Sequence, residues 1–127
     1  MSQSKESLIA RAEAYFRDVD LFETEAILSH LAEDVVLEVP TDGVRKEGLE
    51  AVRETYVKRA DLVRDSWHGD FLYVADESAD RLAIRLAVKR TNVDGTTVEM
   101  DNLTLLSFRG DKITSIAVWM SGENSLT

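Results

Sequence analysis

The amino-acid sequence predicts a single α+β domain in which three N-terminal helices pack on one face of a curved, mainly antiparallel sheet. The length of 127 residues fits one domain over residues 1–127. The spacing of hydrophobic residues changes once along the chain, from the helical period of the first half to the alternation of strands in the second. A run of helices followed by a run of strands is typical of the α+β class.

The first half of the chain contains three predicted helices and one short strand. The first helix is predicted from apolar residues at helical spacing: Leu8, Ala12, Tyr15, Phe16 and Val19. Asp20 and Glu23 are expected to start and cap a second helix, which carries Leu21, Ile27, Leu28 and Leu31. A strand over 35–39 ends at Pro40. A third helix begins near Gly48 and buries Leu49, Val52, Tyr56, Val57 and Val63.

The second half is predicted to be a meander of about four antiparallel strands. These strands are expected over 67–74, 82–88, 98–108 and 112–120. Asp94-Gly95 has the composition of a hairpin turn. If that turn has two residues, Arg85 lies opposite Thr104 and shares its face, since cross-strand partners point to the same side. The other face of the sheet then presents an apolar surface for a homodimer, made of Leu82, Ile84, Leu86 and Val88.

The composition excludes several kinds of protein and site. The formal net charge is −9, which disfavours binding to nucleic acid and to anionic membrane surfaces. The sequence has no cysteine, so disulfides and thiolate metal sites are excluded. The N-terminus lacks the apolar stretch of a signal peptide, and no apolar run is long enough to span a membrane, so we expect a cytoplasmic protein.

The order of these elements and four short segments resemble the nuclear transport factor 2-like superfamily, within it the SnoaL-like and ketosteroid isomerase branches. The segments are 25–27, 34–40, Gly48 at the start of the third helix, and 106–113. The resemblance covers nearly the whole chain and implies a cone-shaped fold, in which a strongly curved sheet and the helices enclose a pocket for a small apolar ligand. It does not specify an activity, because this fold hosts isomerases, cyclases, dehydratases, epoxide hydrolases and non-catalytic binders.

The ketosteroid isomerase pattern is only half present. In that enzyme a base aspartate moves a proton, while a tyrosine and a protonated aspartate stabilise the enolate. Matching the motifs places the oxyanion tyrosine on Tyr15 and its supporting tyrosine on Tyr56. The base aspartate falls on Val39 and the oxyanion aspartate on Thr104. Steroid isomerisation by the known route is therefore not expected.

The predicted site combines a few polar groups with apolar walls. Tyr15 is expected to donate a hydrogen bond, Arg85 to stabilise an anion, and His68 to carry a proton. The remaining pocket residues are Val19, Val39, Tyr56, Phe71, Asn102, Thr104, Leu106, Ile116, Val118 and Met120. Three alternatives stay open. Arg85 could pair with Asp101 or Glu99 on the surface, the tyrosines and inward polar groups could be ordinary core residues, and Trp67 rather than His68 could face the pocket.

Two functions follow from this pattern. The first is a cofactor-free isomerase, cyclase or hydrolase that acts on a small polyketide-, terpenoid- or steroid-like substrate. No metal is expected, since the two histidines lie far apart and neither has an acid at ligand spacing. The second is a non-catalytic ligand-binding or dimeric interaction domain, because Val39 stands where the base of ketosteroid isomerase would be.

Overall fold

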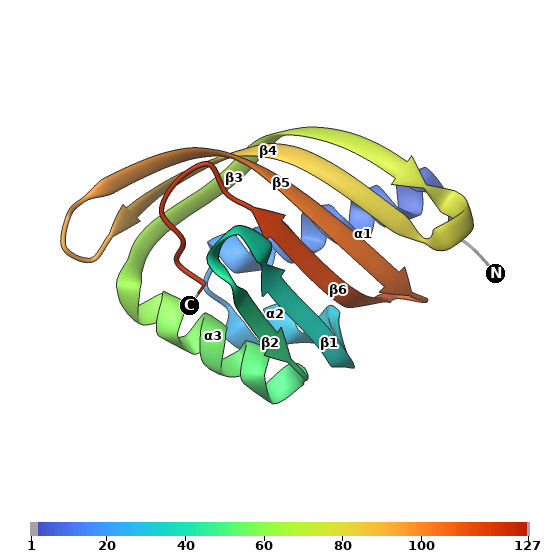
Figure 1. Cartoon of the computed structure of the whole chain (residues 1–127), viewed down its shortest axis with the longest axis horizontal. Helices are drawn as coiled ribbons and strands as arrows, with labels where there is room; N and C mark the ends of the chain where they lie inside the picture. The colour runs from blue at the N-terminus through green and yellow to red at the C-terminus, as the bar shows by residue number, and fades with distance from the viewer. Residues whose placement is uncertain (1–2, 127) are drawn as a thin grey trace.

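A computed structural model describes residues 3–126 of the chain and confirms the α+β class (Figure 1). The helices are α1 (Lys5–Asp20), α2 (Thr24–Ser29) and α3 (Leu49–Leu62). The strands are β1 (Leu31–Val39), β2 (Val44–Glu47), β3 (Val63–Asp76), β4 (Arg81–Asn92), β5 (Thr97–Arg109) and β6 (Lys112–Trp119). No helix in the described part of the chain is long and apolar enough to cross a membrane.

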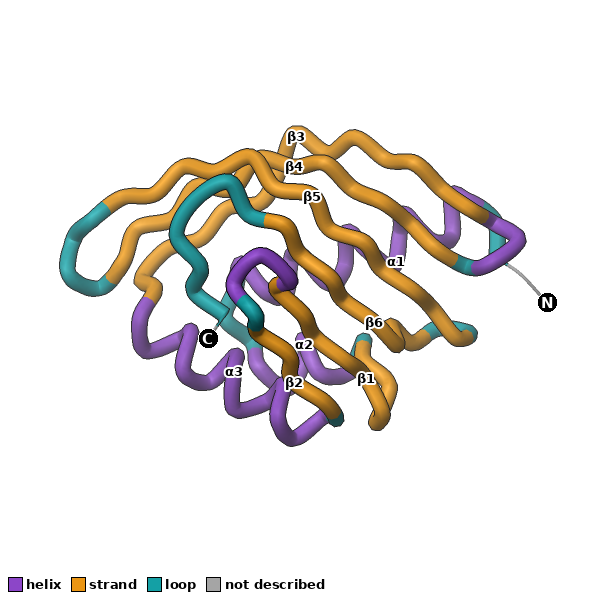
Figure 2. The backbone as a smooth tube through the Cα atoms, in the orientation of Figure 1, coloured by secondary structure: helices purple, strands orange, loops and turns teal. Residues whose placement is uncertain are grey.

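The strands described form one open sheet in the order β2-β1-β6-β5-β4-β3. Only the β1–β6 pairing is parallel, so the sheet is mixed and mostly antiparallel. Figure 2 shows β3, β4 and β5 as long strands that extend beyond the shorter β1, β2 and β6. The sheet keeps two free edges and is not rolled up into the strongly curved cone that we expected. We did not predict the edge strand β2, because three of its four residues are charged and show no apolar alternation. Charged residues are typical of a protected sheet edge.

Helix α1 forms as its sequence predicts, but it ends differently. Its N-cap is Ser4, whose hydroxyl accepts a hydrogen bond from the Ser7 amide at 3.2 Å, and its buried face is the predicted one. The helix continues to Asp20, so this residue does not start α2 as we predicted. Helix α2 begins at Thr24 without a side-chain cap. The Asp20 carboxylate is thereby free to bind elsewhere.

The β4–β5 hairpin has a register one residue away from the predicted one. The Asn92 amide donates to the Thr96 carbonyl oxygen at 2.8 Å, which leaves a three-residue loop over 93–95. Gly95 has φ of +88° there, as expected for the left-handed position of such a loop. Thr104 therefore pairs with Ile84, and Arg85 pairs with Leu103.

This one-residue difference exchanges the two faces of β4, because side chains alternate along a strand. The side chains that we placed on an outer dimer surface are in the core, at 0–3% exposure: Leu82, Ile84, Leu86 and Val88. The four residues that we predicted for the homodimer surface are therefore wrong.

Strand β3 contains a bulge that decides which of its side chains face the helices. Gly69 pairs with Ala87 but Leu72 pairs with Arg85, and Asp70 lies between them at φ of +53°. Before the bulge, His68 points inward and Trp67 outward, with 42% of Trp67 exposed. After the bulge, Phe71 stacks on Phe16 of α1, at 5.4 Å between ring centroids. The bulge thus lets both His68 and Phe71 face α1.

Candidate functional site

A cavity of about 50 Å³ lies between α1, α3 and the inner face of the sheet. Its apolar lining comes from α1, from β4, β5 and β6, and from the chain after β6: Phe16, Val19, Leu86, Val88, Met100, Ile116, Val118, Met120 and Leu126. Its polar lining is Tyr15, Tyr56, Arg59, His68, Arg90, Asn102, Thr104 and Ser125. The result is an apolar chamber with hydroxyl, imidazole, amide and guanidinium groups in its wall. This lining is typical of small-molecule sites, but the volume is well below their usual range of about 300–1,000 Å³.

Most of the predicted pocket residues lie in this lining: Tyr15, Val19, Tyr56, His68, Asn102, Thr104, Ile116, Val118 and Met120. Val39 and Leu106 are fully buried core residues outside the lining. Phe71 packs behind the cavity, against Phe16.

Arg85 is the one proposed catalytic residue that the structure removes from the site. Its guanidinium donates two hydrogen bonds to the carboxylate of Asp101, at 2.6 and 3.1 Å, on the outer face of the sheet. Two thirds of its side chain is exposed (66%). The cause is the hairpin register described above, and the surface pairing with Asp101 that we considered as an alternative is confirmed.

Tyr15 and Tyr56 bring their hydroxyl groups together at the cavity wall, where the two groups share a hydrogen bond. Burial is the main cause that raises the pKa of both phenols, so both stay protonated near neutral pH. Two hydroxyl groups have two protons, and their mutual bond uses only one. The second proton has no acceptor among the described residues and is available to a ligand oxygen.

His68 is held by Asp20, a residue that the sequence reasoning assigned to a helix cap. The Asp20 carboxylate accepts hydrogen bonds from His68 Nδ1 and from the His68 backbone amide, the latter at 2.9 Å. The Ser66 hydroxyl donates to the same carboxylate at 2.8 Å. Burial by itself raises the pKa of Asp20, but the hydrogen bonds from His68 and Ser66 outweigh it and lower that pKa.

This arrangement fixes the tautomer of the imidazole. A carboxylate can only accept, so the neutral form of His68 carries its proton on Nδ1 and has the lone pair on Nε2. Within residues 3–126, Nε2 has no hydrogen-bond partner, and the side chain lines the cavity. The one sequence signal for this role of Asp20 was its place at a helix C-terminus, where a carboxylate is unfavourable unless it is bound by something else.

Arg59 on α3 is a cavity residue that the sequence reasoning missed. It is 4% exposed, its Nη2 donates to the Ser66 hydroxyl at 2.8 Å, and its guanidinium lies over the ring of Phe22 at 5.3 Å. Burial lowers the pKa of this guanidinium. Its position seven residues after Val52 on the buried face of the helix was the available signal.

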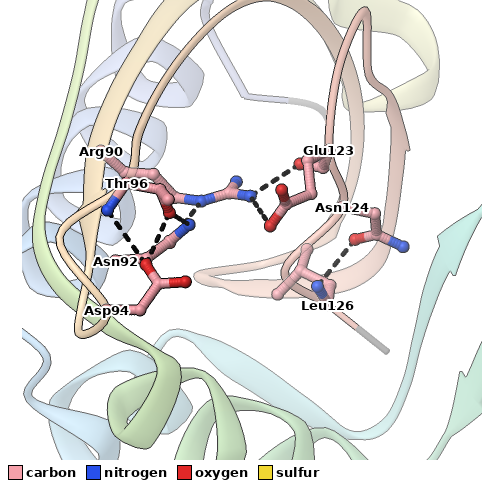
Figure 3. A network of polar contacts seen from close by, with 7 residues as sticks. All are labelled: Arg90, Asn92, Asp94, Thr96, Glu123, Asn124 and Leu126. Atoms are coloured by element: carbon pink, nitrogen blue, oxygen red, sulfur yellow. Dashed lines mark hydrogen bonds and ion pairs between the residues drawn. The ribbon is translucent and has the colours of Figure 1, made fainter.

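Arg90 on β4 connects the cavity to the C-terminal segment (Figure 3). Its Nη2 donates to the Glu123 carbonyl oxygen at 2.9 Å and to the Glu123 carboxylate at 3.2 Å, while its Nε donates to Asn92. The chain after β6 turns back toward α3 (Figure 1), so that Leu126 is buried against the cavity. The segment 121–126 therefore covers one side of the cavity.

The comparison with protein families matches residues 12–116 to the SnoaL-like domain. A polyketide cyclase candidate from Xanthomonas campestris is 19% identical, with 91% of this chain and 90% of that chain covered and a TM-score of 0.81. SalBIII, described as an epoxide hydrolase/cyclase-like enzyme in pyran ring formation, is 21% identical, with 93% of each chain covered and a TM-score of 0.82.

A protein from Catenulispora acidiphila with a ketosteroid isomerase-like fold, solved with trimethylamine, is 16% identical. The alignment covers 91% of this chain and 88% of that one, with a TM-score of 0.78. At these identities the solved structures show a shared fold. Comparison with the curated proteins gives no match. The family match covers most of the chain, and the chain therefore belongs to the SnoaL-like domain family, with a fold similar to that of a nuclear transport factor 2-like protein.

Proposed function

We propose that the protein is a cofactor-free acid–base enzyme, an isomerase or cyclase, acting on a small apolar substrate that has a C–H bond next to a carbonyl group. The observation that carries this proposal is the Asp20–His68 pair in the wall of an apolar cavity. A carboxylate that orients an imidazole and leaves its second nitrogen free is a common arrangement for proton transfer.

The chemistry starts with the removal of a proton. His68 Nε2 takes the proton from the carbon next to the carbonyl, and Asp20 stabilises the imidazolium that forms. The electron pair of the C–H bond moves onto the carbonyl oxygen, and the free hydroxyl proton of the Tyr15–Tyr56 pair binds the resulting enolate. Return of the proton to another carbon completes an isomerisation. Attack of the enolate carbon on a second carbonyl group of the same molecule forms the ring, and the imidazolium of His68 returns its proton to the alkoxide oxygen that results.

Two further observations support this assignment. Val39 occupies the position of the base aspartate in ketosteroid isomerase and cannot take a proton, so a base must come from another wall, and His68 is the group available in the cavity. The similar structures also include a polyketide cyclase candidate and a cyclase-like enzyme. Ring closure that forms a carbon–carbon bond next to a carbonyl group proceeds through an enolate.

The test is deuterium exchange into a simple enolisable ketone. We expect the wild-type protein to catalyse exchange at the two methylene groups next to the carbonyl of 2-indanone in D₂O, measured by proton NMR. His68→Ala should lower the rate by about 100-fold or more, the usual contribution of a general base. Tyr15→Phe should lower it by at least about tenfold, since it breaks the tyrosine pair whose free hydroxyl proton binds the enolate. Arg85→Met, on the outer face, is the matched control and should exchange like the wild type.

The proposal is wrong if wild-type protein that binds 2-indanone gives no exchange above the buffer rate, or if His68→Ala exchanges as fast as the wild type. Binding without exchange would instead support the second function, a non-catalytic binder. That function is favoured by the small cavity and by Leu126, which covers part of it.

We also propose a homodimer through the outer face of the sheet, with residues different from those predicted. Leu72, Leu103 and Trp119 lie with Arg85 in one row across β3, β4, β5 and β6. They are 59%, 45% and 37% exposed. Large apolar side chains grouped on one exposed sheet face are typical of an interaction surface.

A further inference from the structure

We propose that the cavity recognises an anionic oxygen group, a carboxylate, on its apolar ligand, and that Arg59 is the residue that binds it. The inference rests on the proposed function, because it names the substrate class for the same cavity. It assigns to Arg59 the anion-binding role that the sequence suggested for Arg85.

Arg59 is a buried cation without a carboxylate partner. Two arginines are buried in the described part of the chain, Arg59 and Arg90, and both line the cavity. Arg90 pairs with the Glu123 carboxylate at 3.2 Å. Within residues 3–126, Arg59 has no carboxylate oxygen within ion-pair distance. A buried charge is costly unless a counter-charge compensates for it, so we expect this guanidinium to bind an anionic group of a ligand.

The protein groups around Arg59 compensate for its charge only in part, because Asp20 lies beyond ion-pair distance and is bridged to Arg59 by the Ser66 hydroxyl. A guanidinium has five N–H donors, and only one of them is used by a described residue, in the bond to the Ser66 hydroxyl. The nearby carboxylate, Asp20, already accepts from Ser66 and twice from His68. The Phe22 ring covers one face of the guanidinium with apolar surface. Donors of Arg59 therefore remain for a ligand, and a planar carboxylate suits their fork geometry.

The other cavity arginine already has a carboxylate partner, since the largely exposed Glu123 of the C-terminal segment binds Arg90 (Figure 3). Beside Arg90 on the inner face of β4 the lining is apolar, from Leu86 and Val88, and Ile116 of β6 adds to it. A ligand with a hydrocarbon ring at one end and a carboxylate at the other would place each part against a matching wall. The cavity volume of about 50 Å³ is well below the roughly 150 Å³ of a cavity that binds benzene, so a ligand with one ring enters only if the C-terminal segment moves.

The experiment compares benzoate with benzamide, which have nearly the same shape but differ in charge. Binding to the wild-type protein is measured by calorimetry at pH 7, and ¹H–¹⁵N NMR shifts, including that of the Arg59 side chain, show where each ligand lies. We expect benzoate to bind at least about tenfold more tightly than benzamide and to shift the Arg59 Nε–H signal.

Three variants distinguish the effect of the Arg59 guanidinium from the effect of removing a positive charge anywhere on the protein. Arg59→Met should remove the preference for benzoate, whereas Arg59→Lys, which keeps the charge but not the fork, should keep part of it. Arg85→Met removes the same charge from the outer face and should behave like the wild type. The wild-type comparison does not depend on any variant, so a poorly folded Arg59→Met protein does not prevent the test.

Equal affinities for the two ligands, the absence of benzoate binding, or an undiminished preference in folded Arg59→Met would each overturn the inference. Deuterium exchange of the neutral ketone 2-indanone distinguishes a failure of this inference from a failure of the proposed function. Exchange of 2-indanone without a preference for benzoate would contradict only the anion site. A preference for benzoate without exchange would contradict only the enzyme.

Discussion

Asp20 links the stability of the protein to the orientation of its candidate base. Its carboxylate is the acceptor for Ser66 and for both the ring and the backbone amide of His68. These hydrogen bonds favour the ionised form, and they lower the pKa of Asp20 despite its burial. A group whose pKa is lower in the folded than in the unfolded state stabilises the fold above its unfolded pKa, and this stabilisation is lost as the pH falls.

We therefore expect Asp20→Asn to reduce the free energy of unfolding more at pH 6 than at pH 3. The unfolded pKa of aspartate is about 4, so the extra stability is complete at pH 6 and declines below about pH 4. Urea denaturation at several pH values measures the difference between the two proteins. Ser66→Ala removes one of the hydrogen bonds and should show a smaller pH dependence. A difference between the wild type and Asp20→Asn that is the same at every pH would contradict this assignment.

At the scale of elements, the loop between β4 and β5 decides which side chains reach the cavity. Three loop residues, rather than two, place Asn102 and Thr104 on the inner face and Arg85 on the outer one. The loop depends on Gly95, which adopts φ of +88° and has open space where a Cβ atom would point, with no other side chain or backbone segment within 4 Å. Any cost of a substitution there comes from the backbone conformation and not from a clash.

Gly95→Ala should thus destabilise the protein by about 1 kcal/mol, because an alanine is strained at positive φ. Gly95→Asn should cost less, since asparagine tolerates the left-handed region better than alanine. Midpoints of urea unfolding for the three proteins check the order. An alanine variant as stable as the wild type would show that the loop does not need this conformation.

At the scale of the whole molecule, the two faces of the sheet have different roles. The inner face and the helices enclose the cavity, which Leu126 covers from the C-terminal segment. The outer face exposes the row of Leu72, Leu103 and Trp119 around the Arg85–Asp101 pair. The acidic net charge of −9 opposes association of two copies, so an apolar contact has to supply the attraction.

Leu103→Lys should convert the proposed dimer to a monomer, because it places a charge in the centre of the apolar row. Light scattering with size-exclusion chromatography measures the mass. Val57→Lys is the control: Val57 is similarly exposed, at 48%, but lies on α3. A wild-type protein that is monomeric at high concentration would rule the dimer out.

The sequence by itself determined the fold class, the buried face of α1 and most of the cavity lining, including Tyr15, Tyr56 and His68. These features depend on local periodicity and on the order of elements, which a linear pattern contains. The pairing of Asp20 with His68 could not be predicted, since the two residues are 48 positions apart and meet only when α1 packs on β3.

Tertiary structure likewise decided which arginine serves the cavity. Arg85 lies outside the cavity because the β4–β5 loop is one residue longer than predicted. Arg59 and Arg90 line the cavity because their elements pack around it. Arginine carries no hydrophobic signal, so the helical spacing from Val52 marks the face on which Arg59 lies but does not by itself show that the side chain is buried. Its burial depends on long-range packing, and the cavity is the place where that packing leaves a charge available to a ligand.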